Sequence, residues 1–107
     1  MSKLKWDKNF ALEQAADDAE LLQELLVIFK ESFRSDIHLI EQGLAEEEAA
    51  KVCRAAHSIK GAAASLGIIG IHEVVLAIEQ ESRTGGLVIA RENLSLLKSM
   101  HGELENL

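Results

Sequence analysis

The chain has 107 residues and a formal net charge of −7; 48% of its residues are hydrophobic, and it contains no proline and one cysteine. This size predicts a single domain over residues 1–107, the acidic balance argues against nucleic-acid binding, and the lone cysteine excludes a disulfide framework or a cysteine-based metal site. No apolar run approaches the ~18 residues of a membrane span and residues 1–7 lack a signal-peptide core, so we expect a cytoplasmic protein.

Helices are the expected elements, because strands favour more β-branched and aromatic residues than this chain has. A short helix is predicted over about 8–14, with Asp7 as its N-cap. Asp17 or Asp18 would cap a long second helix that ends at about Gly43. The apolar residues of this second helix recur at intervals of three and four, on one helical face: Leu22, Leu26, Phe29, Phe33, Ile37, Ile40 and Leu44.

Three further helices are predicted at about 46–66, 69–83 and 87–104. Each has an apolar stripe with helical spacing, and glycine-containing links separate them. Four long amphipathic helices with short links predict an all-α fold, an antiparallel up-and-down four-helix bundle. The helix at 8–14 would be a short extra helix that covers one end of the bundle.

The third predicted helix contains an outward-facing histidine with small neighbours. On a helical wheel, His57 lies about 140° from the centre of the apolar stripe, so it points away from the core. Gly61, four residues later, costs the helix about 1 kcal/mol relative to alanine, and Ala64 extends the small surface by a further turn. Arg54 and Lys60 stand three residues to either side of His57 and place positive charge near it.

These features suit a phosphate acceptor. An exposed neutral imidazole is a good nucleophile near pH 7, and a nearby cation can stabilise a phosphoryl group placed on it. The small residues would let a large partner approach His57. An ordinary solvated histidine in a passive helical interaction module would also fit this spacing, so the residues alone leave both interpretations open.

A longer series of motifs extends along the chain. In chain order they are Trp6-Asp7, Asp18-x-Glu20-Leu21-Leu22-x-Glu24-Leu25-Leu26-x-x-Phe29, His57-x-x-Lys60-Gly61, Leu66-Gly67, Ile78-Glu79 and Arg83-x-Gly85. Together they resemble the histidine phosphotransfer (HPt) domain family of two-component phosphorelays. The likeness covers nearly the whole chain, and the combination of motifs is highly specific.

The resemblance implies a role for each residue of the site. His57 would be phosphorylated on an exposed helix face and would exchange the phosphoryl group with an aspartate of a response-regulator receiver domain. Lys60 would steady the phosphoryl group, and Gly61 would give clearance for the partner. Glu79 would accept the Nδ1 proton of His57 and leave Nε2 free to attack, although some family members carry glutamine at the position of Glu79.

The implied function is that of a phosphocarrier, which accepts a phosphoryl group from one receiver domain and passes it to another. Phosphate-binding loops of the Gly-x-x-x-x-Gly-Lys or Gly-x-Gly-x-x-Gly type are missing, so we expect a carrier without an ATP site rather than an enzyme. We expect a monomer without cofactor or bound metal, with Mg²⁺ held only by the receiver partner. A hybrid sensor histidine kinase is a second candidate partner, and the chain would not bind nucleic acid or membrane.

One alternative stays within the same chemistry. The segment could be the phospho-accepting domain of a larger hybrid or chemotaxis-type histidine kinase, in which case an ATP-bound kinase domain would supply the phosphoryl group. A start at Met1 slightly favours a free-standing protein. The motifs name neither the partner receiver nor the direction of phosphoryl flow.

The second predicted helix has an unusually wide apolar face near its start, where Leu21, Leu25 and Ile28 lie to one side of the main stripe. A bundle helix contacts two neighbours, and this packing would account for the width. Alternatively, part of the face stays exposed beside His57 and forms an apolar docking patch together with Leu12. Both interpretations remain open at this point.

Overall fold

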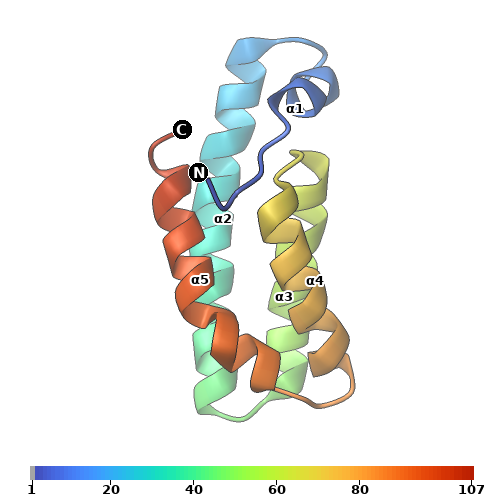
Figure 1. The fold of residues 1–107 in the computed structure, drawn as a ribbon, viewed down its shortest axis with the longest axis vertical. Helices are drawn as coiled ribbons and strands as arrows, with labels where there is room; N and C mark the ends of the chain where they lie inside the picture. Colours follow the sequence, from blue (N-terminus) through green and yellow to red (C-terminus); the bar gives the residue numbers. More distant parts are fainter. Residues whose placement is uncertain (1) are drawn as a thin grey trace.

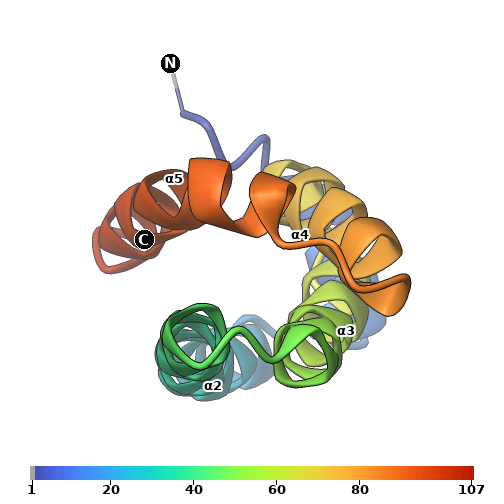
Figure 2. The ribbon, with the colours of Figure 1, turned by 90° about the horizontal axis from the view of Figure 1, so that it is seen from below.

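The computed structural model describes residues 2–107, and they form the predicted all-α bundle (Figure 1). Its helices are α1 (Lys8–Gln14), α2 (Ala19–Ala45), α3 (Ala49–Ser65), α4 (Ile69–Arg83) and α5 (Val88–Leu104). The four long helices run alternately down and up the long axis. Seen along that axis, α3 lies between α2 and α4, and α5 lies between α4 and α2 (Figure 2). The short α1 packs across one end of the bundle.

Aspartates begin the first two helices. The carboxylate of Asp7 accepts a hydrogen bond from the backbone N–H of Phe10 at 3.0 Å, which caps α1 as predicted. Asp18 accepts hydrogen bonds from the N–H groups of Glu20 and Leu21 at 3.0 and 3.2 Å. Asp18, rather than Asp17, is therefore the N-cap of α2. Its side chain satisfies backbone N–H groups that have no partner within the helix.

Gly43 does not end the second helix, contrary to the sequence-based prediction. The residue is buried inside α2, which continues to Ala45, and α3 begins at Ala49 rather than near Glu46. A Cβ atom on Gly43 would lie only 2.7 Å from Cγ2 of Val52. The glycine therefore permits the close approach of α3 to α2, a tertiary reason that the local pattern does not reveal.

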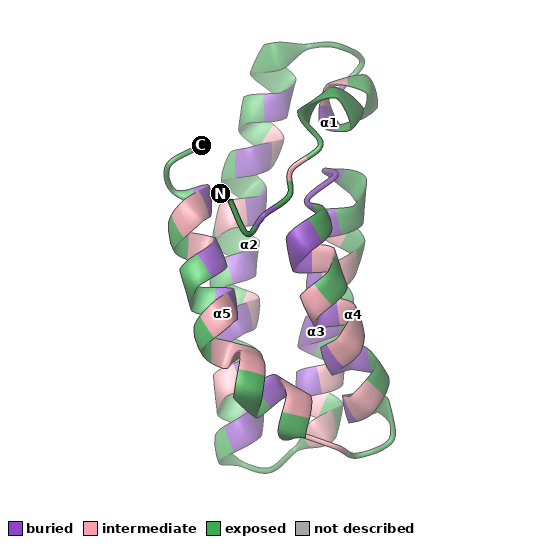
Figure 3. Ribbon diagram, in the orientation of Figure 1, coloured by how far each residue is buried: buried purple, intermediate pink, exposed green. Residues whose placement is uncertain are grey.

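The apolar stripes of the four long helices meet in one core, and the buried residues lie on their inward faces (Figure 3). Phe29 and Phe33 of α2 stack with ring centroids 5.4 Å apart. His101 of α5 lies against Phe33, and its Nε2 is 2.9 Å from the carbonyl oxygen of Lys30. Each fully buried Leu, Ile or Phe side chain contributes about 1.5–3 kcal/mol, so the core holds α3 and α4 firmly in place.

The segment before α1 is part of the bundle. Leu4 is buried, and its carbonyl oxygen accepts a hydrogen bond from the N–H of Gly70 at 2.7 Å. The indole N–H of Trp6 donates to the carbonyl oxygen of Leu66 at 2.9 Å. Residues 2–7 therefore bind the turn between α3 and α4, and in Figure 1 they cross from the side of α5 to that turn.

Candidate functional site

His57 lies in the middle of α3, on the face away from the core, and 69% of its side chain is exposed. Its Nδ1 is 2.5 Å from Oε2 of Glu79 on α4. An ionised carboxylate only accepts hydrogen bonds, so this contact assigns the proton of the neutral ring to Nδ1. Nε2 then carries the free lone pair on the exposed edge of the ring.

Glu79 is the buried centre of this cluster, with 2% of its side chain exposed. Its Oε1 accepts a hydrogen bond from Nζ of Lys60 at 2.6 Å, and Nη2 of Arg83 lies 3.5 Å from its Oε2. The hydrogen bond from Lys60, reinforced by that from His57, holds the pKa of Glu79 below its ordinary value although burial acts in the opposite direction. Glu79 is therefore a carboxylate at neutral pH.

The antiparallel packing of α3 and α4 brings these four side chains together. His57 and Lys60 are one turn apart on α3, and Glu79 and Arg83 are one turn apart on α4. The two helices are close beside the site, where Sγ of Cys53 lies 3.8 Å from the carbonyl oxygen of Glu79. The Glu79 carboxylate is thus buried where α3 and α4 meet, in contact with the exposed His57.

The cations are arranged differently from the sequence-based expectation. Lys60 is not a free flanking charge: only 25% of its side chain is exposed, and it is bound to Glu79. Arg54 is exposed and, within residues 2–107, takes part in no ion pair. Arg83 also belongs to this cluster, a role that the motifs did not assign to it, although its position four residues after Glu79 was a usable signal for an ion pair.

Gly61 leaves an open surface beside His57. It is exposed one turn further along α3, and a Cβ atom placed on it would meet nothing within 4 Å. Ala64, one turn later, is also exposed and small. A partner surface can therefore approach this half of α3 without meeting long side chains.

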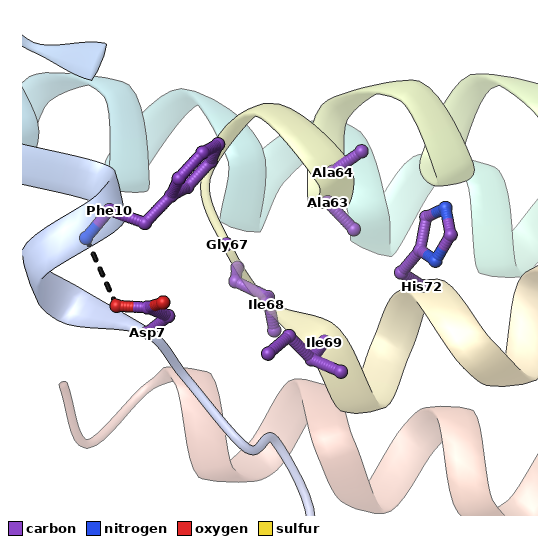
Figure 4. A pocket seen from close by; sticks show the side chains of 8 residues that line it. All are labelled: Asp7, Phe10, Ala63, Ala64, Gly67, Ile68, Ile69 and His72. Atoms are coloured by element: carbon purple, nitrogen blue, oxygen red, sulfur yellow. Dashed lines mark hydrogen bonds between the residues drawn. The ribbon is translucent and has the colours of Figure 1, made fainter. Parts of the chain in front are cut away.

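Two apolar hollows lie on either side of α3 beyond Gly61. The first, of about 270 Å³, lies between α1 and the start of α4, with Phe10 and His72 on opposite sides and Ile69 along its floor (Figure 4). The second, of about 360 Å³, lies between α2 and α3 and is lined by residues that include Ile28 and Ala62. Ile28 is 62% exposed, so packing between helices does not account for the whole apolar width of α2.

The family model described as the Hpt domain matches residues 24–107, which is most of the chain. The chain belongs to the Hpt domain family. Hpt domains are phosphocarriers that act in histidine phosphotransfer in two-component signalling, and they interact with receiver and kinase domains. No curated protein and no solved structure matched the chain.

The match to the Hpt domain includes both helices that form the cluster, α3 and α4, and leaves α1 outside. Each helix of the described part of the chain is too short or too polar to span a lipid bilayer. Among residues 2–107, no three His, Cys, Asp or Glu side chains gather in a way that would hold a metal ion.

Proposed function

We propose that His57 is the phosphoacceptor of this Hpt domain and carries a phosphoryl group between receiver domains of response regulators. The observation that carries the proposal is the hydrogen bond between Nδ1 of His57 and the buried Glu79. This bond orients an exposed imidazole with Nε2 directed away from the protein, beside the open surface at Gly61. The arrangement suits a nucleophile that receives its substrate from a partner protein.

In the proposed reaction, the Nε2 lone pair attacks the phosphorus of an aspartyl phosphate on the receiver. The Nε2–P bond forms while the P–O bond to the aspartate breaks, and the aspartate carboxylate leaves. The Nδ1 proton stays on the ring, hydrogen-bonded to Glu79, whose negative charge stabilises the positive charge that develops on the imidazole. Return transfer follows the same path in reverse.

The carrier role places the remaining chemistry in the partner. The phosphoryl group arrives already activated, so the chain needs no ATP site and no cofactor of its own. Any Mg²⁺ that the transfer requires is held by the carboxylates of the receiver. In this proposal residues 1–107 act as one Hpt unit, a monomer in the cytoplasm.

The proposed docking surface for the receiver is the exposed apolar part of α2 beside α3. Leu21 and Ile28 are exposed, while Leu12 and Leu25 are partly buried against the core. Exposed apolar groups of this kind often mark binding sites on small proteins. An apolar centre with a polar rim also suits an acidic protein better than a purely electrostatic contact does.

Incubation with ³²P-labelled receivers of the source genome tests the proposal. We expect acid-labile, alkali-stable label from at least one receiver. His57→Gln should abolish the label with an unchanged circular dichroism spectrum, and His38→Gln, which changes another exposed histidine, should keep it. Label on His57→Gln would refute the assignment. If no receiver labels the protein but an ATP-charged kinase domain does, the chain would be a segment of a histidine kinase. If neither donor labels it, the chain would be a passive interaction module.

A further inference from the structure

The positive charge around Glu79 exceeds the single negative charge of its carboxylate. Lys60 binds Oε1 at 2.6 Å, and Arg83 approaches Oε2, the oxygen that also accepts Nδ1 of His57. One negative charge thus faces two permanent positive charges next to the ring. The excess positive charge lies where phosphorylation would add negative charge.

Arg83 is held more loosely than Lys60. Its Nη2 lies 3.5 Å from Glu79, longer than a normal hydrogen bond, and 63% of its side chain is exposed. At this distance, and with the guanidinium mostly in solvent, the contact of Arg83 with Glu79 contributes little to stability. Because Lys60 remains on the other oxygen, the guanidinium of Arg83 can leave the carboxylate without exposing an unpaired buried charge.

There is open space for the guanidinium to move. Arg83 is the last residue of α4 and lines a hollow of about 450 Å³ between the start of α3 and the end of α4. Arg83 and His57 share one oxygen of Glu79 as a partner, so the guanidinium lies next to the ring. Most of the Arg83 side chain is in solvent, so the guanidinium has room to leave Glu79 for a group held on the neighbouring ring.

A phosphoryl group on Nε2 would compete for this arginine. It brings roughly two negative charges and three acceptor oxygens, and a planar guanidinium binds phosphate through two parallel hydrogen bonds. From these contacts we infer that Arg83 is a phosphoryl-binding residue that changes partner, from Glu79 in the free protein to the phosphoryl group in the phosphorylated protein. The inference rests on the proposed assignment of His57 as the phosphoacceptor.

NMR of arginine side chains tests the change of partner directly in the intact protein. Phosphoramidate serves as a small donor: its P–N bond breaks, ammonia leaves and the Nε2–P bond forms. On phosphorylation, the Nε–H signal of Arg83 should shift and its exchange with water should slow. The matched control is Arg34, an exposed arginine paired with Glu105 at 2.9 Å, whose signal should not change. A silent Arg83 signal in a phosphorylated sample would overturn the inference.

Equilibrium measurements provide a second test. With a phosphorylated receiver, Arg83→Gln should lower the equilibrium constant for phosphoryl transfer to the protein by roughly two- to fivefold, the scale of an exposed charge pair. Arg83→Lys should restore part of the loss, and Arg34→Gln should have no effect. Equal equilibrium constants for Arg83→Gln and the wild type would overturn this inference and leave the proposed function intact. A wild-type protein that takes no phosphate on His57 would overturn the function and this inference with it.

Discussion

Lys60 of α3 donates a hydrogen bond from Nζ to Oε1 of Glu79, the buried carboxylate of the site. This contact gives Lys60 a structural role as well as a chemical one. The sequence alone suggests an exposed lysine with little effect on stability. The structure instead predicts that its removal leaves a buried oxygen of Glu79 without its strongest partner.

Lys60→Ala should therefore lower the free energy of unfolding by about 1–3 kcal/mol, the range for a buried polar group that loses its partner, and should slow phosphoryl transfer. Urea denaturation and transfer kinetics measure the two effects. Lys98→Ala is the control, because Lys98 makes an ion pair of similar length, 2.7 Å, with the partly exposed Glu41, and its loss should cost clearly less than the loss of Lys60. Equal losses in the two variants would show that the burial of Glu79 is not decisive.

Gly61→Gln should separate stability from transfer. Glutamine has a better helix propensity than glycine, and the site is open, so the melting temperature should stay the same or rise with a gain of up to about 1 kcal/mol. Transfer from a receiver should slow, because the longer side chain occupies the space beside His57. Gly61→Ala should gain similar stability with a smaller kinetic effect. Normal transfer in the glutamine variant would mean that clearance is not the reason for the glycine.

Glu79 predicts a particular pH dependence of stability. Chiefly through the hydrogen bond from Lys60, the folded protein holds the pKa of Glu79 below its ordinary value of 4.5. A lowered folded-state pKa stabilises the protein above the unfolded-state value, and this stabilisation disappears as the pH falls through the folded-state value.

Glu79→Gln should consequently be less stable than the wild type at pH 7, by about 1–3 kcal/mol, and the difference should shrink below about pH 4.5. Urea denaturation from pH 7 to pH 3 measures it. The exposed Glu105, paired with Arg34, provides the control variant Glu105→Gln, which should show a much smaller difference throughout. A difference for Glu79→Gln that widens with acid would contradict the assigned direction of the pKa.

Ile28→Asp tests the proposed docking surface. The side chain is mostly exposed, so thermal stability should change by less than about 0.5 kcal/mol, whereas receiver affinity should fall by at least tenfold, about 1.4 kcal/mol. Titration calorimetry with the cognate receiver measures affinity. The neighbouring exposed Val27 does not line the hollow between α2 and α3, so Val27→Asp should bind normally. Unchanged affinity for Ile28→Asp would remove this hollow from the interface.

Features that depend on neighbours in the chain were predictable from the sequence. The N-cap at Asp7, the apolar spacing of the long helices and the outward position of His57 all follow from local periodicity, and the structure agrees with them. The prediction that the second helix ends at Gly43 is wrong, because this glycine makes room for Val52 on the next helix. A local pattern contains no information about such a contact.

The charged part of the site was only partly predictable for the same reason. A helical wheel places Lys60 near His57 but cannot show that its ammonium group turns to a carboxylate nineteen residues later. The burial of Glu79 arises only when α3 and α4 pack together. The family resemblance suggested that Glu79 lies near His57, and the spacing of Glu79 and Arg83 allowed their ion pair, whereas the hydrogen bond from Lys60 to the same carboxylate required the packed structure.

The buried Leu4 and its hydrogen bond to Gly70 tie the segment before α1 to the bundle. The family match starts at residue 24, yet a protein trimmed to that point would lose the contacts of Leu4 and Trp6 with the α3–α4 turn. It would also lose the hydrogen bond from Lys3 Nζ to Ser99 Oγ of α5 at 2.9 Å. Limited proteolysis should therefore find the chain at residues 4–7 resistant to cleavage. Shortened versions intended for biophysical work should keep them, although they lie outside the region that defines the family.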